Sequence, residues 1–61
     1  MQILTTWRDA LGHMRALVAE IKDPETGKDL VVSRWFDTFK NAHYETEPRH
    51  LVALTQSKVR Q

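Results

Sequence analysis

The sequence predicts a small all-α protein built from one long helix and two short helices. Three observations lead to this fold class. Large apolar residues at the start of the chain recur at helical intervals, an Asp-Pro pair followed by a glycine predicts a turn, and helix-capping residues precede two later apolar segments. With 61 residues and no cysteine, the chain is expected to form one domain, 1–61, without disulfides.

The first helix is predicted over residues 2–22. Six large apolar side chains in this segment are separated alternately by three and four residues, which places them on one stripe of a helix. They are Leu4, Trp7, Leu11, Met14, Val18 and Ile21. Such a helix extends roughly 30 Å. Gly12 is its weak point, because glycine costs about 1 kcal/mol relative to alanine inside a helix.

A turn is predicted over residues 23–29. Asp23-Pro24 ends the helix, because proline disfavours helical geometry in the preceding residue and has no N–H to donate. The flanking residues also permit an alternative, an α+β protein with a short β-hairpin around residues 17–32. The helix is favoured, because Val18 and Ile21 continue the helical spacing in phase.

Two shorter helices are predicted over residues 33–43 and 47–58. Ser33 is the expected N-cap of the first, and Thr46 is the expected N-cap of the second. Pro48 would occupy the first turn of the second helix, where its missing N–H costs nothing. No internal repeat and no low-complexity segment is apparent along the chain.

Nothing in the sequence points to catalysis, a cofactor or a metal ion. The chain offers no cysteine nucleophile, no glycine-rich phosphate loop and no Gly-x-Ser-x-Gly motif. His43 and His50 are seven residues apart, a spacing that matches no metal-ligand motif. We therefore expect a protein that is not an enzyme. No apolar run is long enough to cross a membrane, so a cytoplasmic location is expected.

The apolar stripe predicts a non-catalytic module that binds and regulates a larger protein. Ile3, Ala10 and Leu17 widen the stripe to nine apolar positions. Two short helices cannot cover all nine, so part of the stripe is expected to face another chain or a second copy in a homodimer. The predicted partner interface consists of Trp7, Arg8, Leu11, Met14, Arg15 and Val18. An accessory subunit that folds only within an assembly is an alternative.

Nucleic-acid binding is the other alternative. The second and third predicted helices could imitate a helix-turn-helix, with the third helix presented to DNA. Its contacts would be Arg49, His50, Lys58 and Arg60. The formal net charge of +1 is far from the strongly basic footprint of most DNA-binding domains. Protein binding is therefore favoured over DNA binding.

Overall fold

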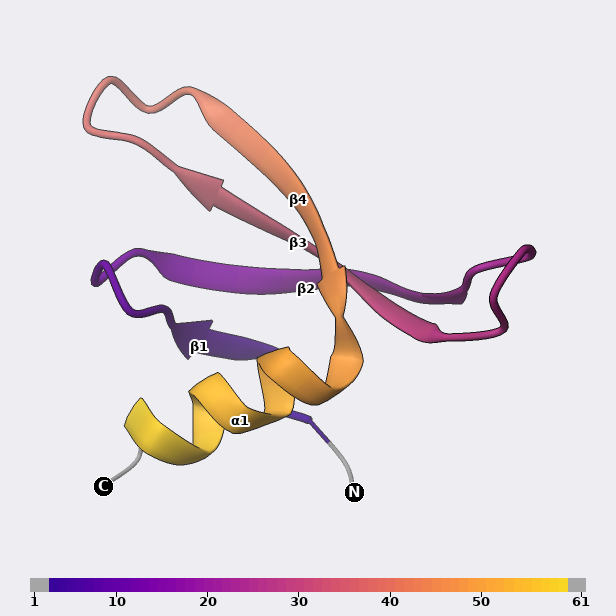
Figure 1. Ribbon diagram of the computed structural model, residues 1–61. Helices are drawn as coiled ribbons and strands as arrows, with labels where there is room; N and C mark the ends of the chain where they lie inside the picture. The colour runs from indigo at the N-terminus through magenta and orange to yellow at the C-terminus, as the bar shows by residue number, and fades with distance from the viewer. Residues whose placement is uncertain (1–2, 60–61) are drawn as a thin grey trace.

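The computed structural model describes residues 3–59 and shows a four-stranded antiparallel sheet with one helix packed against it (Figure 1). The strands follow one another in chain order, each pairing with its neighbour. The elements are β1 (Thr6–Arg8), β2 (Met14–Lys22), β3 (Asp29–Phe36), β4 (Ala42–Pro48) and α1 (Arg49–Val59). The prediction of an all-α protein, a bundle of one long helix and two short helices, is therefore wrong.

Only the last of the three predicted helices has a counterpart, because α1 occupies most of residues 47–58. The predicted helix 2–22 is replaced by β1, a loop and β2. The predicted helix 33–43 is replaced by the end of β3, a turn and the start of β4. The alternative hairpin around residues 17–32 corresponds to part of the β2–β3 pair, where Ile21 lies opposite Leu30.

A β-bulge explains why β2 looks like a helix in the sequence. The register shifts between Leu17 and Ala19, so that Val18 is an extra residue. Side chains alternate between the two faces of a strand, and one extra residue changes the phase of this alternation. Met14 precedes the bulge and Ile21 follows it, yet both lie on the same face. The spacing of four and then three through Val18 thus imitates helical periodicity.

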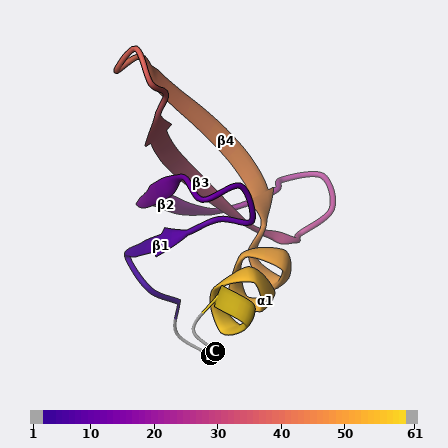
Figure 2. The ribbon, with the colours of Figure 1, turned by 90° about the vertical axis from the view of Figure 1, so that its left-hand side faces the viewer.

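One face of the sheet is covered by α1, which lies beneath β1 (Figures 1 and 2). The core between the two layers contains Ile3, Trp7, Val31, Val52 and Ala53, and Leu17 packs against it. Gln56 of the helix is buried and bonds both backbone groups of Leu4, accepting from its N–H at 2.8 Å and donating to its carbonyl at 3.3 Å. The start of the chain is thereby tied to the helix.

The loops at the β1–β2 and β3–β4 ends are built in the same way. Asp9 Oδ1 accepts hydrogen bonds from the backbone N–H groups of Leu11 and His13, at 3.0 and 2.9 Å. Asp37 Oδ1 accepts the equivalent bonds from Phe39 and Asn41, at 2.8 and 2.9 Å. Both loops are therefore Asx-type turns with an apolar residue at the apex.

The backbone of the two loops matches as well. The fourth residue of each has a positive φ, which is 89° at Gly12 and 65° at Lys40. The apical side chains of Leu11 and Phe39 are 82% and 84% exposed. A glycine that was expected to weaken a helix thus supplies the left-handed conformation that this turn requires.

This similarity reveals an internal repeat, so the expectation of a chain without repeats is wrong. Trp35 and Asp37 follow Trp7 and Asp9 by the same 28 residues. The same offset relates the apolar pair Ile3–Leu4 to Val31–Val32, and the loop apex Leu11 to Phe39. The two units share the order apolar-apolar-Thr/Ser-x-Trp-x-Asp-x-apolar over residues 3–11 and 31–39.

The third loop lies at the opposite end of the sheet and carries the β2–β3 turn (Figure 1). Asp23 organises it, because its Oδ1 accepts from Glu25 N–H at 2.9 Å and its carbonyl accepts from Gly27 N–H at 2.8 Å. Gly27 has a φ of 73°. The turn expected from Asp23-Pro24 and Gly27 thus connects two strands and does not follow a helix.

Candidate interaction surfaces

The helix covers only part of its face of the sheet, and the uncovered part holds a group of charged and aromatic side chains. Cross-strand partners project from the same face, so the pairs Trp7–Arg15, Ser33–Glu45 and Trp35–His43 place these residues on the helix side. We call this group the ionic–aromatic cluster. Its members are Asp9, His13, Arg15, Trp35, Asp37, His43, Glu45 and Glu47.

Arg15 is the centre of the cluster. Its guanidinium donates from Nε to Asp9 Oδ2 at 2.7 Å and from Nη1 to Ser33 Oγ at 3.1 Å. The same Nη1 lies 2.7 Å from Glu45 Oε2 and 3.7 Å from Glu47 Oε1. Arg15 is buried, and a guanidinium can remain charged there because its planar fork reaches several carboxylates at once.

The carboxylates respond to this cation. Burial opposes ionisation of Asp9, but hydrogen bonds from Arg15 and from the His13 backbone outweigh it and lower the pKa of Asp9. The hydrogen bond from Arg15 also lowers the pKa of Glu45. Burial works against the charge of Arg15, but its bonds to Asp9 and Glu45 outweigh that effect and raise its pKa. The ion pairs thus keep all three groups charged.

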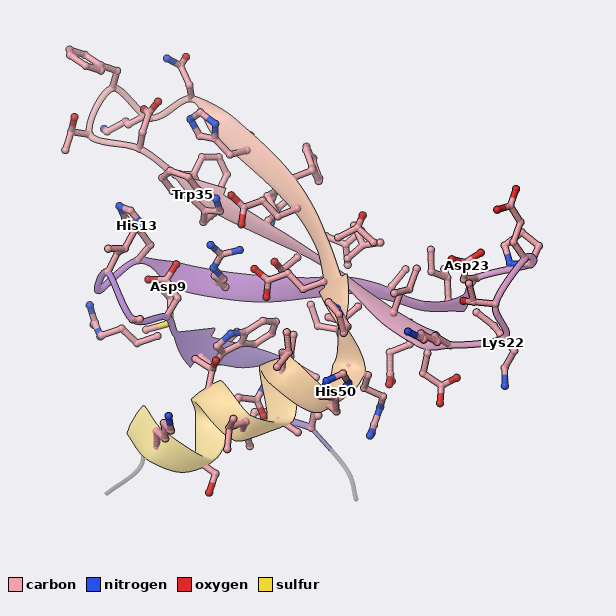
Figure 3. The ribbon with its side chains drawn as sticks, in the orientation of Figure 1. Asp9, His13, Lys22, Asp23, Trp35 and His50 are labelled. Atoms are coloured by element: carbon pink, nitrogen blue, oxygen red, sulfur yellow. The ribbon has the colours of Figure 1, made fainter. Side chains whose placement is uncertain are left out.

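Three rings stack beside Arg15. The Trp35 ring lies between the imidazoles of His13 and His43, with centroids 4.1 and 4.4 Å apart and interplanar angles of 19° and 16°. Figure 3 shows Trp35, His13 and Asp9 together at one end of the sheet. His43 Nε2 is 2.8 Å from Asp37 Oδ2, and this bond is the main reason for the lowered pKa of Asp37.

Two buried polar atoms of the stack lack a hydrogen-bond partner among residues 3–59. His13 Nδ1 lies 3.6 Å from Asp9 Oδ2, which is beyond hydrogen-bond distance. The Trp35 indole nitrogen makes no hydrogen bond of good geometry, although it is close enough to Glu45 to help lower the pKa of that carboxyl. Asp9, Glu45 and Glu47 share Arg15 as their ion-pair partner, and Asp37 contacts His43. These contacts come from several strands, so we assign the cluster a structural role in joining β2, β3 and β4.

Two findings concern ions and membranes. Over residues 3–59, no group of three or more His, Cys, Asp or Glu side chains is arranged to hold a metal ion. The helix in this part of the chain is neither long enough nor apolar enough to cross a membrane.

The opposite side of the sheet, which we call the open face, has no helix against it in the described part of the chain. Cross-strand pairs such as Ala16–Arg34, Arg34–Tyr44 and Ile21–Leu30 define its residues. It presents mainly apolar side chains, and many of the large ones are exposed. Its strand residues are Thr6, Arg8, Met14, Ala16, Val18, Ala19, Ile21, Leu30, Val32, Arg34, Phe36, Ala42, Tyr44, Thr46 and Pro48.

The charge of the open face is of one sign. Arg8 and Arg34 project from it, and none of its residues is acidic. The guanidinium carbon of Arg34 lies 5.3 Å from the centroid of the Phe36 ring, a cation–π contact. The Nε atom of Arg34 is buried and lacks a hydrogen-bond partner among the described residues. This side of the sheet is therefore apolar with an unneutralised positive charge.

The structure divides the predicted partner interface between these surfaces. Trp7 is buried beneath the helix and Arg15 is buried in the ionic–aromatic cluster, so neither lies on a free surface. Arg8, Met14 and Val18 lie on the open face, and Leu11 is the apex of the first loop. The residues therefore do not form the single helical stripe that their spacing suggested.

The structure also separates the predicted nucleic-acid contacts from the helix-turn-helix that was expected to present them. No helix-turn-helix exists within residues 3–59, because α1 follows directly from β4. Arg49 Nε donates to Glu20 Oε1 at 2.8 Å, while His50 and Lys58 are exposed on the helix. Arg60 lies outside the described residues.

Sequence reasoning missed several residues of both surfaces. The predicted helix 33–43 contains Trp35 of the stack and Phe36 of the open face. Tyr44, also on the open face, comes directly after the end of that predicted helix. The 28-residue repeat was the available signal, because it aligns the second Trp-x-Asp segment with the first and favours a repeated hairpin.

Comparisons with protein-family models, curated proteins and solved structures gave no match.

Proposed function

We propose that the protein is a non-catalytic interaction module that binds a larger protein through the open face of its sheet. The observation that supports this most directly is the exposure of large apolar side chains on that face. Met14 is 54% exposed, Val18 51%, Ile21 46% and Phe36 53%. An apolar sheet face normally packs against a second layer, and the one helix within residues 3–59 packs on the other side.

The number of large apolar side chains exposed on the open face supports a protein partner. Contiguous exposed apolar patches on soluble proteins commonly mark interaction sites. Each large side chain that becomes buried contributes roughly 1 kcal/mol or more at about 25 cal/mol per Å² of apolar surface. Several such residues on one rigid sheet could together supply the hydrophobic centre of an interface.

The same chemistry weighs against a nucleic-acid partner. Binding of single-stranded nucleic acid relies on stacked aromatic rings and a basic groove. The open face has two exposed aromatic residues, Phe36 and Tyr44, but aliphatic residues occupy most of β2 and the start of β3. Aliphatic side chains offer no π-face to a base. Two arginines also provide few contacts for phosphates.

A matched pair of variants tests the proposal. Ile21→Glu places a carboxylate on the open face, whereas Leu54→Glu makes the same change on the helix, where Leu54 is 50% exposed. We expect a protein to co-purify with the wild type and with the Leu54→Glu variant, and to be lost from the Ile21→Glu variant. Circular dichroism would establish that both variants are folded. A partner retained equally by all three proteins would refute binding through the open face.

A further inference from the structure

We infer that the segment docking on the open face is an amphipathic helix of the partner that carries carboxylates near one end. This inference rests on the proposed function and specifies the chemistry of its partner. It is carried by the uneven distribution of charge along the strands of the open face.

The residues of this face form four rows across the sheet. The two rows nearest the Leu11 and Phe39 loops contain Arg8 and Arg34, with Met14, Phe36 and Tyr44 among their neighbours. The two rows nearer the β2–β3 turn are uncharged. These two rows contain Val18, Ala19, Ile21, Leu30, Val32, Thr46 and Pro48. The open face therefore has a basic, aromatic end and an aliphatic end.

A complementary surface must neutralise the basic end. A guanidinium that loses water without gaining a carboxylate or another acceptor is strongly unfavourable. Arg34 is partly exposed and forms no ion pair with a carboxylate among residues 3–59, so an incoming carboxylate would neutralise a charge that this part of the chain leaves unpaired. Carboxylates over Arg8 and Arg34 would also orient the partner, because charge complementarity determines register and specificity.

A second copy of the chain lacks this chemistry. If two open faces packed together, each pair of arginines would meet a surface without any acidic residue, whichever way the copies were turned. The acidic side chains near the sheet lie on the helix side, where Arg15 engages Asp9 and Glu45. A different chain with its own carboxylates is therefore the better fit.

The dimensions suit one helix. Residues on the same face of a strand are about 6.8 Å apart, so four rows extend roughly 20 Å. An α-helix covers that length in about 14 residues, or four turns. On the other side of the sheet, the 11 residues of α1 cover only part of the face, so the docking helix must be longer than α1 to reach both ends. One amphipathic helix lying along β2 and β3 would thus contact both ends of the open face.

Site-specific photo-crosslinking of the full chain, in the cells that make it, tests this inference. A benzophenone amino acid is introduced at Tyr44 near the basic end, at Ile21 near the aliphatic end, or at Leu54 on the helix as the control. The crosslinked peptides are then identified by mass spectrometry. We expect Tyr44 and Ile21 to label one helical segment of one protein, with its carboxylates nearer the site labelled from Tyr44.

The outcomes separate this inference from the proposed function. Crosslinks from the open face to a second copy, or to a protein segment without carboxylates, would overturn the acidic helix and leave protein binding intact. Crosslinks to nucleic acid, or labelling no stronger than from Leu54, would overturn both.

A binding measurement provides the second test. The labelled segment is synthesised as a peptide and titrated against the wild type, Arg34→Ala and the control Lys58→Ala, which removes an exposed charge from the helix. We expect Arg34→Ala to weaken binding about fivefold at low salt, with a smaller loss at high salt. Equal affinity for the wild type and Arg34→Ala would overturn the acidic contact.

Discussion

Arg15 is the residue on which the charged side of the sheet depends. It extends from β2 and contacts carboxylates that belong to the first loop and to β4, while its Nη1 also bonds the hydroxyl of Ser33 on β3. Ser33 is only 1% exposed, so water cannot replace that contact. One side chain thus joins three strands on the part of the sheet that the helix leaves uncovered.

Replacing Arg15 should therefore cost more than replacing an ordinary surface arginine. We expect Arg15→Met to lower the free energy of unfolding by about 2–3 kcal/mol, because Asp9 loses its cation while it remains largely buried. Glu45 is more exposed and adds less. Urea denaturation would measure this loss. The control Arg8→Met should change stability by less than about 1 kcal/mol, and an equal loss in both variants would contradict this role for Arg15.

The lowered carboxyl pKa values also predict how stability depends on pH. Asp9, Asp37 and Glu45 all have pKa values in the folded protein below their ordinary values of 3.8, 3.8 and 4.5. The unfolded chain then binds more protons than the folded one in acid. The stabilisation from these groups is complete well above pH 4.5 and is lost as the pH falls through their folded values.

The denaturant concentration at the unfolding midpoint, measured from pH 6 to about pH 2.5, should consequently decrease as the pH is lowered. The variant Asp9→Asn should be less stable at pH 6 and should lose less stability on acidification, because one of the three linked protons is removed. A wild-type midpoint that stays constant down to the lowest pH would contradict the ion pairs described for Asp9 and Glu45.

At the scale of the element, the bulge in β2 decides which side chains reach which face. It allows Met14 and Ile21 to share the open face although they are seven residues apart, an odd number that regular alternation would place on opposite sides. The sequence alone could not reveal this. A strand with one extra residue and an amphipathic helix share the same spacing of four and three over Met14, Val18 and Ile21.

Single-residue deletions would test the bulge directly. Deleting Val18 removes the extra residue and leaves Ala19 opposite Val32, so we expect a folded protein destabilised by no more than about 2 kcal/mol. Deleting Val32 from the facing strand increases the mismatch, so we expect that variant to lose cooperative unfolding. Thermal denaturation followed by circular dichroism compares them, and greater damage from the Val18 deletion would contradict the assigned register.

Some of the other elements could be predicted from the sequence, and others could not. The turn around Asp23-Pro24 and Gly27 and the C-terminal helix have local causes, which are proline and glycine geometry and a short apolar face. The sheet has a non-local cause, because β1 and β4 acquire their faces only by pairing with β2 and β3. The clearest sign of that pairing was the repeat of Trp and Asp at the same offset, which indicates two similar hairpins.

At the scale of the whole molecule, the two layers are unequal. Four strands form the sheet, while an 11-residue helix covers part of one side. The buried apolar residues gather where α1 crosses β1 and β3. The end of the sheet that carries the exposed Leu11 and Phe39 loops therefore extends beyond the core. Figure 2 shows β4 rising away from the helix. The large apolar side chains of the open face therefore remain exposed.

The two tryptophans of the repeat lie in different halves of this arrangement. Trp7 is enclosed by the core under α1, and Trp35 is held between two imidazoles beyond it. Their indole fluorescence therefore offers two built-in optical reporters. With Trp35→Phe, the remaining emission follows the docking of the helix, and with Trp7→Phe it follows the ordering of the distant hairpin, so the assembly of each half can be timed separately.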